Sequence, residues 1–184
     1  MHTVFISGSM RIKNLDNNVL TKINKIIDKN FKVIVGDADG VDSSIQGYLV
    51  SRNAKSVIVY CSGEQPRNNI GHWIVKKVET NAKPGTRDFF TAKDIEMAED
   101  CDYGLMIWDT KSTGTLCNAI EVLKRKKISL VYINKSKEFL KIKNVSDVEK
   151  LVSFMSDSSF KKADKKIKLK EQINSLKYIQ SSIF

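Results

Sequence analysis

The sequence contains few of the features that mark secreted, membrane-spanning or disordered proteins. Its 184 residues include only two prolines and no Ser/Gly-rich or Gln-rich tract, so neither a linker nor a disordered segment is expected. No window approaches the roughly 18 apolar residues of a membrane span, and the first ten residues lack the basic and apolar regions of a secretion signal. The three cysteines are odd in number and lack CxxC spacing, which argues against a disulfide framework or a zinc site. We therefore expect a cytoplasmic protein with no membrane partner and no bound metal.

Acidic residues are scarce only in the last third of the chain. Residues 1–121 hold 15 basic and 15 acidic side chains, whereas residues 122–184 hold 16 and 6. The whole formal charge of +10 therefore comes from the C-terminal part. A ligand site built from the first two-thirds is expected to lie in a nearly neutral body, and the basic C-terminal part needs a separate explanation.

Short β-branched and apolar runs alternate with amphipathic segments along the first 134 residues. The runs predict five strands: Thr3–Ser7, Phe31–Gly36, Lys55–Tyr60, Tyr103–Trp108 and Ile128–Ile133. Apolar residues at three- and four-residue spacing predict helices between them, including one over Ile70–Val78. The strands are continuously apolar, which is typical of a parallel sheet covered on both faces. The fold class is therefore α/β, a Rossmann-like three-layer sandwich with a mainly parallel sheet of about five strands and additional C-terminal helices.

The last fifty residues are predicted to form a basic helical extension, residues 135–184, on a domain spanning residues 1–134. A short strand is possible at FLKIK, followed by a helix over VSDVEKLVSFM and a long basic segment. That segment carries a loose apolar stripe of Ile167, Leu169, Ile173, Leu176, Ile179 and Ile183. We expect the stripe to pack on the domain or on a second subunit, which makes the chain a predicted homo-oligomer.

The expected ligand site lies where the strand order reverses. With right-handed crossovers, the first three strands run outward on one side and the last two on the other, so the first and fourth strands are neighbours. Two hydroxyl-rich, glycine-bearing loops follow these strands, each just before a helix, and such loops suit phosphate. Their candidate ligand-binding residues are Ser7, Gly8, Ser9 and Arg11 in one loop, and Asp109, Ser112, Gly114 and Thr115 in the other, with Asn118 in the helix that follows it.

A third loop, GDADGVD after the second strand, is rich in carboxylates. Its spacing lacks the remaining ligands of a calcium loop, so we expect its carboxylates to accept ribose hydroxyls or to cap the following helix. After the third strand, Arg67 and Asn68 are placed to reach over the ligand, while Lys93 and Asp94 either contact phosphate or are simply solvated. The candidates of the GDADGVD loop are Gly36, Asp37, Asp39, Gly40 and Asp42.

With GSMR, GDADGVD and WDTKSTGT after its first, second and fourth strands, the sequence resembles the SLOG superfamily of Rossmann-like nucleotide-binding proteins over roughly residues 3–134. This superfamily is similar in fold to the Lonely Guy phosphoribohydrolases, the DNA-processing protein A family and the nucleotide-sensing domains of some defence systems. The middle of the chain looks like a prokaryotic and phage subgroup, which implies a role in conflict between phages and bacteria. The resemblance implies a nucleotide-derived small-molecule ligand and gives no reason to expect a separate cofactor.

One position departs from the pattern of the relatives that hydrolyse N-glycosidic bonds. Their loop after the fourth strand reads GGxGTxxE, with the glutamate acting on the sugar. Gly114 and Thr115 match, but Asn118 stands at the glutamate position, and an amide cannot act as a carboxylate base or nucleophile. Glu121 lies one turn further along the helix, and Asp42, Asp39 or Asp109 could supply a carboxylate from another loop, although no spacing singles one out. Glu121 and Asp42 are the candidate catalytic residues.

Three functions follow, in order of preference. The first is binding of a nucleotide or nucleotide-derived phosphosugar between the first and fourth strands, by a sensor or sequestering protein. The second is hydrolysis or transfer at a ribosyl carbon. The third, and least favoured, is nucleic-acid binding through the basic C-terminal segment, because a lysine-rich amphipathic helix is commonly just a solvated face.

Overall fold

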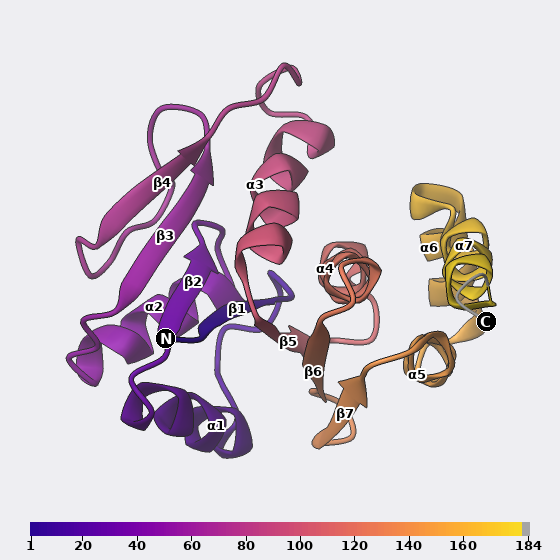
Figure 1. Cartoon of the computed structure of the whole chain (residues 1–184), viewed down its shortest axis with the longest axis horizontal. Helices are drawn as coiled ribbons and strands as arrows, with labels where there is room; N and C mark the ends of the chain where they lie inside the picture. The colour runs from indigo at the N-terminus through magenta and orange to yellow at the C-terminus, as the bar shows by residue number, and fades with distance from the viewer. Residues whose placement is uncertain (182–184) are drawn as a thin grey trace.

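The computed structural model describes residues 1–181, with side chains as far as Tyr178. A seven-stranded sheet with the order β4-β3-β2-β1-β5-β6-β7 forms its centre (Figure 1). All neighbouring strands are parallel except β6 and β7, which are antiparallel. The α/β class and the mainly parallel sheet are confirmed. The strands are β1 (Thr3–Gly8), β2 (Lys32–Gly36), β3 (Val57–Ser62), β4 (Ile74–Val78), β5 (Tyr103–Trp108), β6 (Ile128–Ile133) and β7 (Glu138–Ile142).

Helices cover both faces of the sheet, as its continuously apolar strands require. The helices are α1 (Asn17–Asp28), α2 (Val41–Ser51), α3 (Arg87–Asp100), α4 (Thr113–Lys124), α5 (Val145–Val152), α6 (Asp157–Ile167) and α7 (Leu169–Ser181). One apolar cluster joins α1 and α2 to one face of the sheet. A second and larger cluster packs α3, α4, α5, α6 and α7 against the opposite face of the sheet. The result is the three-layer arrangement visible in Figure 1.

The prediction of a helix over Ile70–Val78 is wrong, because this segment contains the edge strand β4. Its register pairs Ile74 with Ile58 and Val78 with Ser62. Ile74 is 75% exposed, so the apolar spacing that suggested a helix face does not point into a core. The β-branched residues of the segment instead complete a sheet edge. Together with β7, this strand raises the count from the predicted five to seven.

The C-terminal residues add to the same core as the rest of the chain. Strand β7 pairs with β6, and α5 begins with a capping box in which Asn144 and Asp147 bond each other's backbone. Lys168, in the left-handed conformation with φ 52°, ends α6 and separates it from α7, so the basic segment forms two helices. The described stripe residues Ile167, Leu169, Ile173 and Leu176 are buried in one cluster with Leu116 of α4.

The predicted homo-oligomer relied on that stripe. The described residues of the stripe pack inside the core of one chain and do not form a surface for a second subunit. The oligomer therefore stays a prediction. Ile183 lies outside the described residues, and the side chain of Ile179 lies outside the described side chains. Within residues 1–181, none of the helices has the length and hydrophobicity that crossing a bilayer requires.

Candidate functional site

The loops after β1 and β5 lie side by side at the carboxyl edge of the sheet. The strand order confirms the expected reversal, since β1 separates β2 from β5. The Ser9 hydroxyl accepts a hydrogen bond from the Asp109 backbone N–H at 3.1 Å and lies 3.4 Å from the Thr115 hydroxyl. The Ser9 backbone N–H donates to the Ile107 carbonyl at 2.9 Å. Ser9 is fully buried, so it joins the two loops and does not face the ligand space.

The loop after β5 presents the start of α4. The Asp109 carboxylate accepts the N–H groups of Lys111 and Ser112 through one oxygen, and Ser112 caps the helix by accepting from Thr115. The N–H groups of Thr113 and Gly114 lie in the first turn, where no intrahelical acceptor exists. A Cβ added at Gly114 would meet no atom within 4 Å. These two donors therefore lie at an open helix start, a favourable place for an anion.

Thr110 in the same loop has strained backbone geometry. Its φ is 65°, a left-handed conformation that a β-branched residue rarely adopts, and it is 6% exposed. Such conformations persist where the surrounding structure enforces them, often in ligand-binding loops. The surrounding loop therefore holds Thr110 in this conformation.

Asn118, the amide at the glutamate position of the hydrolysing relatives, holds the end of β1. Its side-chain N–H donates to the Ser7 hydroxyl at 2.9 Å, and Ser7 in turn donates to the Met106 sulfur at 3.2 Å. Asn118 and Ser7 are both at least 95% buried. A carboxylate at this position could not donate to Ser7, so the amide has a defined structural role here.

The loop after β2 is held by a network of hydrogen bonds. Arg67 donates to both oxygens of Asp37, at 2.7 and 3.1 Å, and its backbone N–H donates to Asp37 at 3.0 Å. Asn68 donates to the Asp37 carbonyl and to Asp39, at 2.8 and 3.0 Å. Although burial acts to raise the pKa of Asp37, the bonds from Arg67 and the charge of Lys93 lower it below its ordinary value. Asp37, Asp39 and Asn68 thus form contacts within the protein, and their contacts with a ligand stay predictions.

A buried charged cluster lies beneath this loop. The Lys93 ammonium is 2.8 Å from Asp94 and 3.9 Å from Asp37, and both Lys93 and Asp42 are at least 95% buried. Burial opposes the charge of Lys93, but Asp94 and Asp42 raise its pKa. Burial is also the main reason that the pKa of Asp42 rises to about 7, against the attraction of Lys93. Asp42 is therefore a carboxyl that exchanges a proton near neutral pH.

We expect the substitution Asp42→Asn to change the pH dependence of stability. The pKa of Asp42 is about 7 in the folded protein, against an ordinary value of 3.8. Between these pH values the native protein therefore binds more protons than the unfolded chain, and it loses stability as the pH rises through them. The substitution would remove this loss, so the stability of the variant relative to the wild-type protein should rise by about 4 kcal/mol between pH 4 and pH 8. Urea unfolding across this range measures the difference. A difference that stays flat across this range would contradict the assignment.

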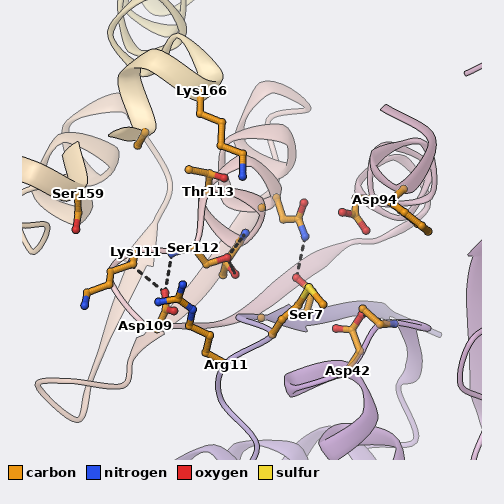
Figure 2. Close-up of a pocket in the computed structure, with 18 of the residues that line it drawn as sticks. Ser7, Arg11, Asp42, Asp94, Asp109, Lys111, Ser112, Thr113, Ser159 and Lys166 are labelled. Carbon is orange, nitrogen blue, oxygen red and sulfur yellow. Dashed lines mark hydrogen bonds between the residues drawn. The ribbon is translucent and has the colours of Figure 1, made fainter. Parts of the chain in front are cut away.

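A cavity of about 710 Å³ opens between the loops after β1 and β5, the starts of α2 and α4, the middle of α3, and α6 (Figure 2). Ten of the predicted site residues line it: Ser7, Gly8, Arg11, Asp42, Arg67, Asp109, Ser112, Gly114, Thr115 and Asn118. The other six do not line it: Ser9, Gly36, Asp37, Asp39, Gly40 and Asn68. One whole wall of the cavity was not predicted from the sequence, and it is formed by Ser156, Ser158, Ser159, Lys162, Ala163 and Lys166. Its only signal was the i, i+4 spacing of the two lysines.

Glu121 does not line the cavity. Its carboxylate oxygens bind Lys124 and Arg125, each at 2.7 Å. Burial acts to raise the pKa of Glu121, but these two hydrogen bonds lower it below its ordinary value. Of the two candidate catalytic carboxylates, only Asp42 lines the cavity. No group of three or more metal-ligating side chains is arranged to hold a metal ion in the described part of the chain.

Comparison with known proteins gives a likeness of fold. No protein-family model and no curated protein matches the sequence. The chain is similar in structure to DNA processing protein A from Helicobacter pylori, which was solved in a study of how that protein binds single-stranded DNA. The TM-score is 0.53 at 18% sequence identity, and the match covers 71% of this chain and 64% of the other. At this identity, the likeness establishes the Rossmann-like fold that the sequence predicted.

Proposed function

We propose that this chain binds a nucleotide or nucleotide-derived phosphosugar in the cavity between β1 and β5. One observation carries the proposal: the first turn of α4, with its free N–H donors at Thr113 and Gly114, opens into a cavity of about 710 Å³. That volume is in the range of small-molecule sites. We also propose that the chain is a member of the SLOG superfamily and of its prokaryotic and phage subgroup.

The site is better suited to a sensor or sequestering protein than to a hydrolase. Asn118 occupies the position of the catalytic glutamate and is engaged with Ser7, and Glu121 is ion-paired outside the cavity. Asp42, Asp94 and Asp109 are the carboxyls that line the cavity. Among them Asp42 is the candidate for cleavage at a ribosyl carbon, because its raised pKa suits proton transfer near neutral pH. A role in conflict between phages and bacteria fits a protein that binds a nucleotide signal without consuming it.

Single-stranded nucleic acid is a second candidate ligand of the same surface. The structural relative binds single-stranded DNA. A smaller cavity of about 270 Å³ shares Asp109, Lys111, Ser156 and Ser159 with the larger one, so the two together could follow a nucleotide chain. Such binding depends steeply on salt, because each phosphate contact releases counterions.

Thermal unfolding in the presence of ligands tests the proposal. The panel contains nucleosides, nucleoside phosphates, ribose 5-phosphate and a single-stranded oligonucleotide, with chromatographic detection of released base in the same samples. We expect a nucleoside phosphate to raise the melting temperature without base release. Release of free base would instead favour the enzyme, and stabilisation by the oligonucleotide alone would favour nucleic acid. If no member of the panel changes the melting temperature, the proposal is wrong.

A further inference from the structure

The basic side chains that line the cavity fall into two sets. Two are neutralised by carboxylates: Arg67 by Asp37 at 2.7 Å, and Lys93 by Asp94 at 2.8 Å. The others form no ion pair within the described residues 1–181. This unpaired set consists of Arg11, Lys111, Lys162 and Lys166.

These unpaired cations belong to elements around the start of α4. Arg11 follows β1, Lys111 precedes α4, and Lys162 and Lys166 are one helical turn apart on α6. In Figure 2 the Lys166 amino group points toward Thr113, while Asp42 and Asp94 lie at the other side of the cavity. The basic C-terminal segment thus contributes to the same end of the cavity as the two predicted phosphate loops.

The charges at this end exceed those of one phosphate group. Four unpaired cations face one lining carboxylate, Asp109, so three positive charges remain. A phosphate monoester carries about −1.5 to −2 at neutral pH, which leaves part of this charge unmatched. A second phosphate group would supply the remaining negative charge and additional acceptors for the lysines.

The other end of the cavity suits an uncharged, hydroxyl-bearing group. There the charges of Lys93 and Arg67 are already matched by Asp94 and Asp37. The Asp42 carboxyl can accept or donate a hydrogen bond, since its pKa is raised to about 7. The Arg67 guanidinium stacks 4.5 Å from the centre of the Phe90 ring, and both line the cavity. A sugar and a planar base can be accommodated at this end.

We infer that the ligand carries at least two phosphate groups, as in nucleoside diphosphates, and that Lys162 and Lys166 bind the phosphate more distant from the sugar. The inference rests on the proposed function, because it assumes that the first phosphate lies at the start of α4. It also gives the basic C-terminal segment a role inside the ligand site.

Calorimetric titration distinguishes the contributions of the two phosphate groups to the binding affinity. The ligands are the four common ribonucleosides as monophosphates and as diphosphates, each titrated into the wild-type chain. The test variant is Lys162→Gln/Lys166→Gln. The control, Lys161→Gln/Lys165→Gln, removes the same charge from the same helix at two exposed lysines that do not line the cavity. Thermal unfolding without ligand verifies that all three proteins are equally folded.

We expect the wild-type chain to bind a diphosphate at least about tenfold more tightly than the matching monophosphate, a ratio equivalent to about 1.4 kcal/mol. The test variant should lose this preference and keep its affinity for the monophosphate, whereas the control should keep both. Equal wild-type affinities for the two ligands, or equal losses in test and control variants, would overturn the inference and leave the proposed function standing. Absence of all nucleotide binding would overturn both.

Discussion

Replacing Gly114 by aspartate should abolish nucleotide binding and leave the fold intact. A Cβ added at this position meets no atom within 4 Å, and an acidic residue in the first turn of a helix stabilises it by about 0.5 kcal/mol. The same carboxylate would occupy the anion site at the start of α4 and repel a phosphate. Affinity should fall by at least about 100-fold, or about 3 kcal/mol, while the free energy of unfolding without ligand stays equal or rises.

Gly47→Asp is the matched control for this prediction. Gly47 lies within α2, and a Cβ added there also meets no atom within 4 Å, but it does not line the cavity. The control should keep its helix stability or gain about 0.3 kcal/mol, because aspartate has a slightly higher helix propensity than glycine, and it should keep its affinity for the ligand. Undiminished ligand affinity in Gly114→Asp, measured by calorimetry, would show that the start of α4 is not the phosphate site.

Replacing Gly40 by alanine should destabilise the chain by about 4 kcal/mol. Gly40 has φ 79° and ψ −122°, a conformation open only to glycine, and a Cβ there would overlap the backbone of Met10. The substitution therefore strains the backbone at Gly40. It also pushes the loop after β2 away from the loop after β1. Denaturant unfolding measures the loss.

Gly85→Ala isolates the strain from the clash. Gly85 has φ 81°, close to that of Gly40, but no atom lies within 4 Å of an added Cβ. This control should cost only about 1–2 kcal/mol, the strain of the left-handed conformation. Equal losses for the two variants would mean that the close approach to Met10 contributes nothing to stability.

The order of the central strands was predictable because it follows from the chirality of parallel crossovers. Continuous apolar runs such as Tyr103–Trp108 identified buried strands, and right-handed connections then made β1 and β5 neighbours. The edge strand β4 was not predictable in this way. The strand has no alternation of apolar and polar residues that would distinguish it from a helix. Ile74 is exposed, and Lys76 and Lys77 each pair with an acidic side chain.

The site was predictable where it depends on loops that follow buried strands. Arg11 and Gly114 line the cavity because the sheet brings their loops together. The wall formed by α6 was missed because the spacing of Lys162 and Lys166 does not tell on which side of the sheet the C-terminal helices pack. Glu121 lies outside the cavity for a local reason, since its carboxylate pairs with Lys124 at the end of the same helix and with Arg125 just after it. Its catalytic role stays a prediction.

The most direct test of the phosphate site follows the backbone amides by nuclear magnetic resonance during titration with a nucleoside phosphate. The account predicts that the amide signals of Thr113 and Gly114 move most, because these N–H groups would donate directly to the phosphate. The signals of the exposed edge strand β4 should stay in place. Unchanged signals at Thr113 and Gly114 in the presence of a bound nucleotide would contradict the account.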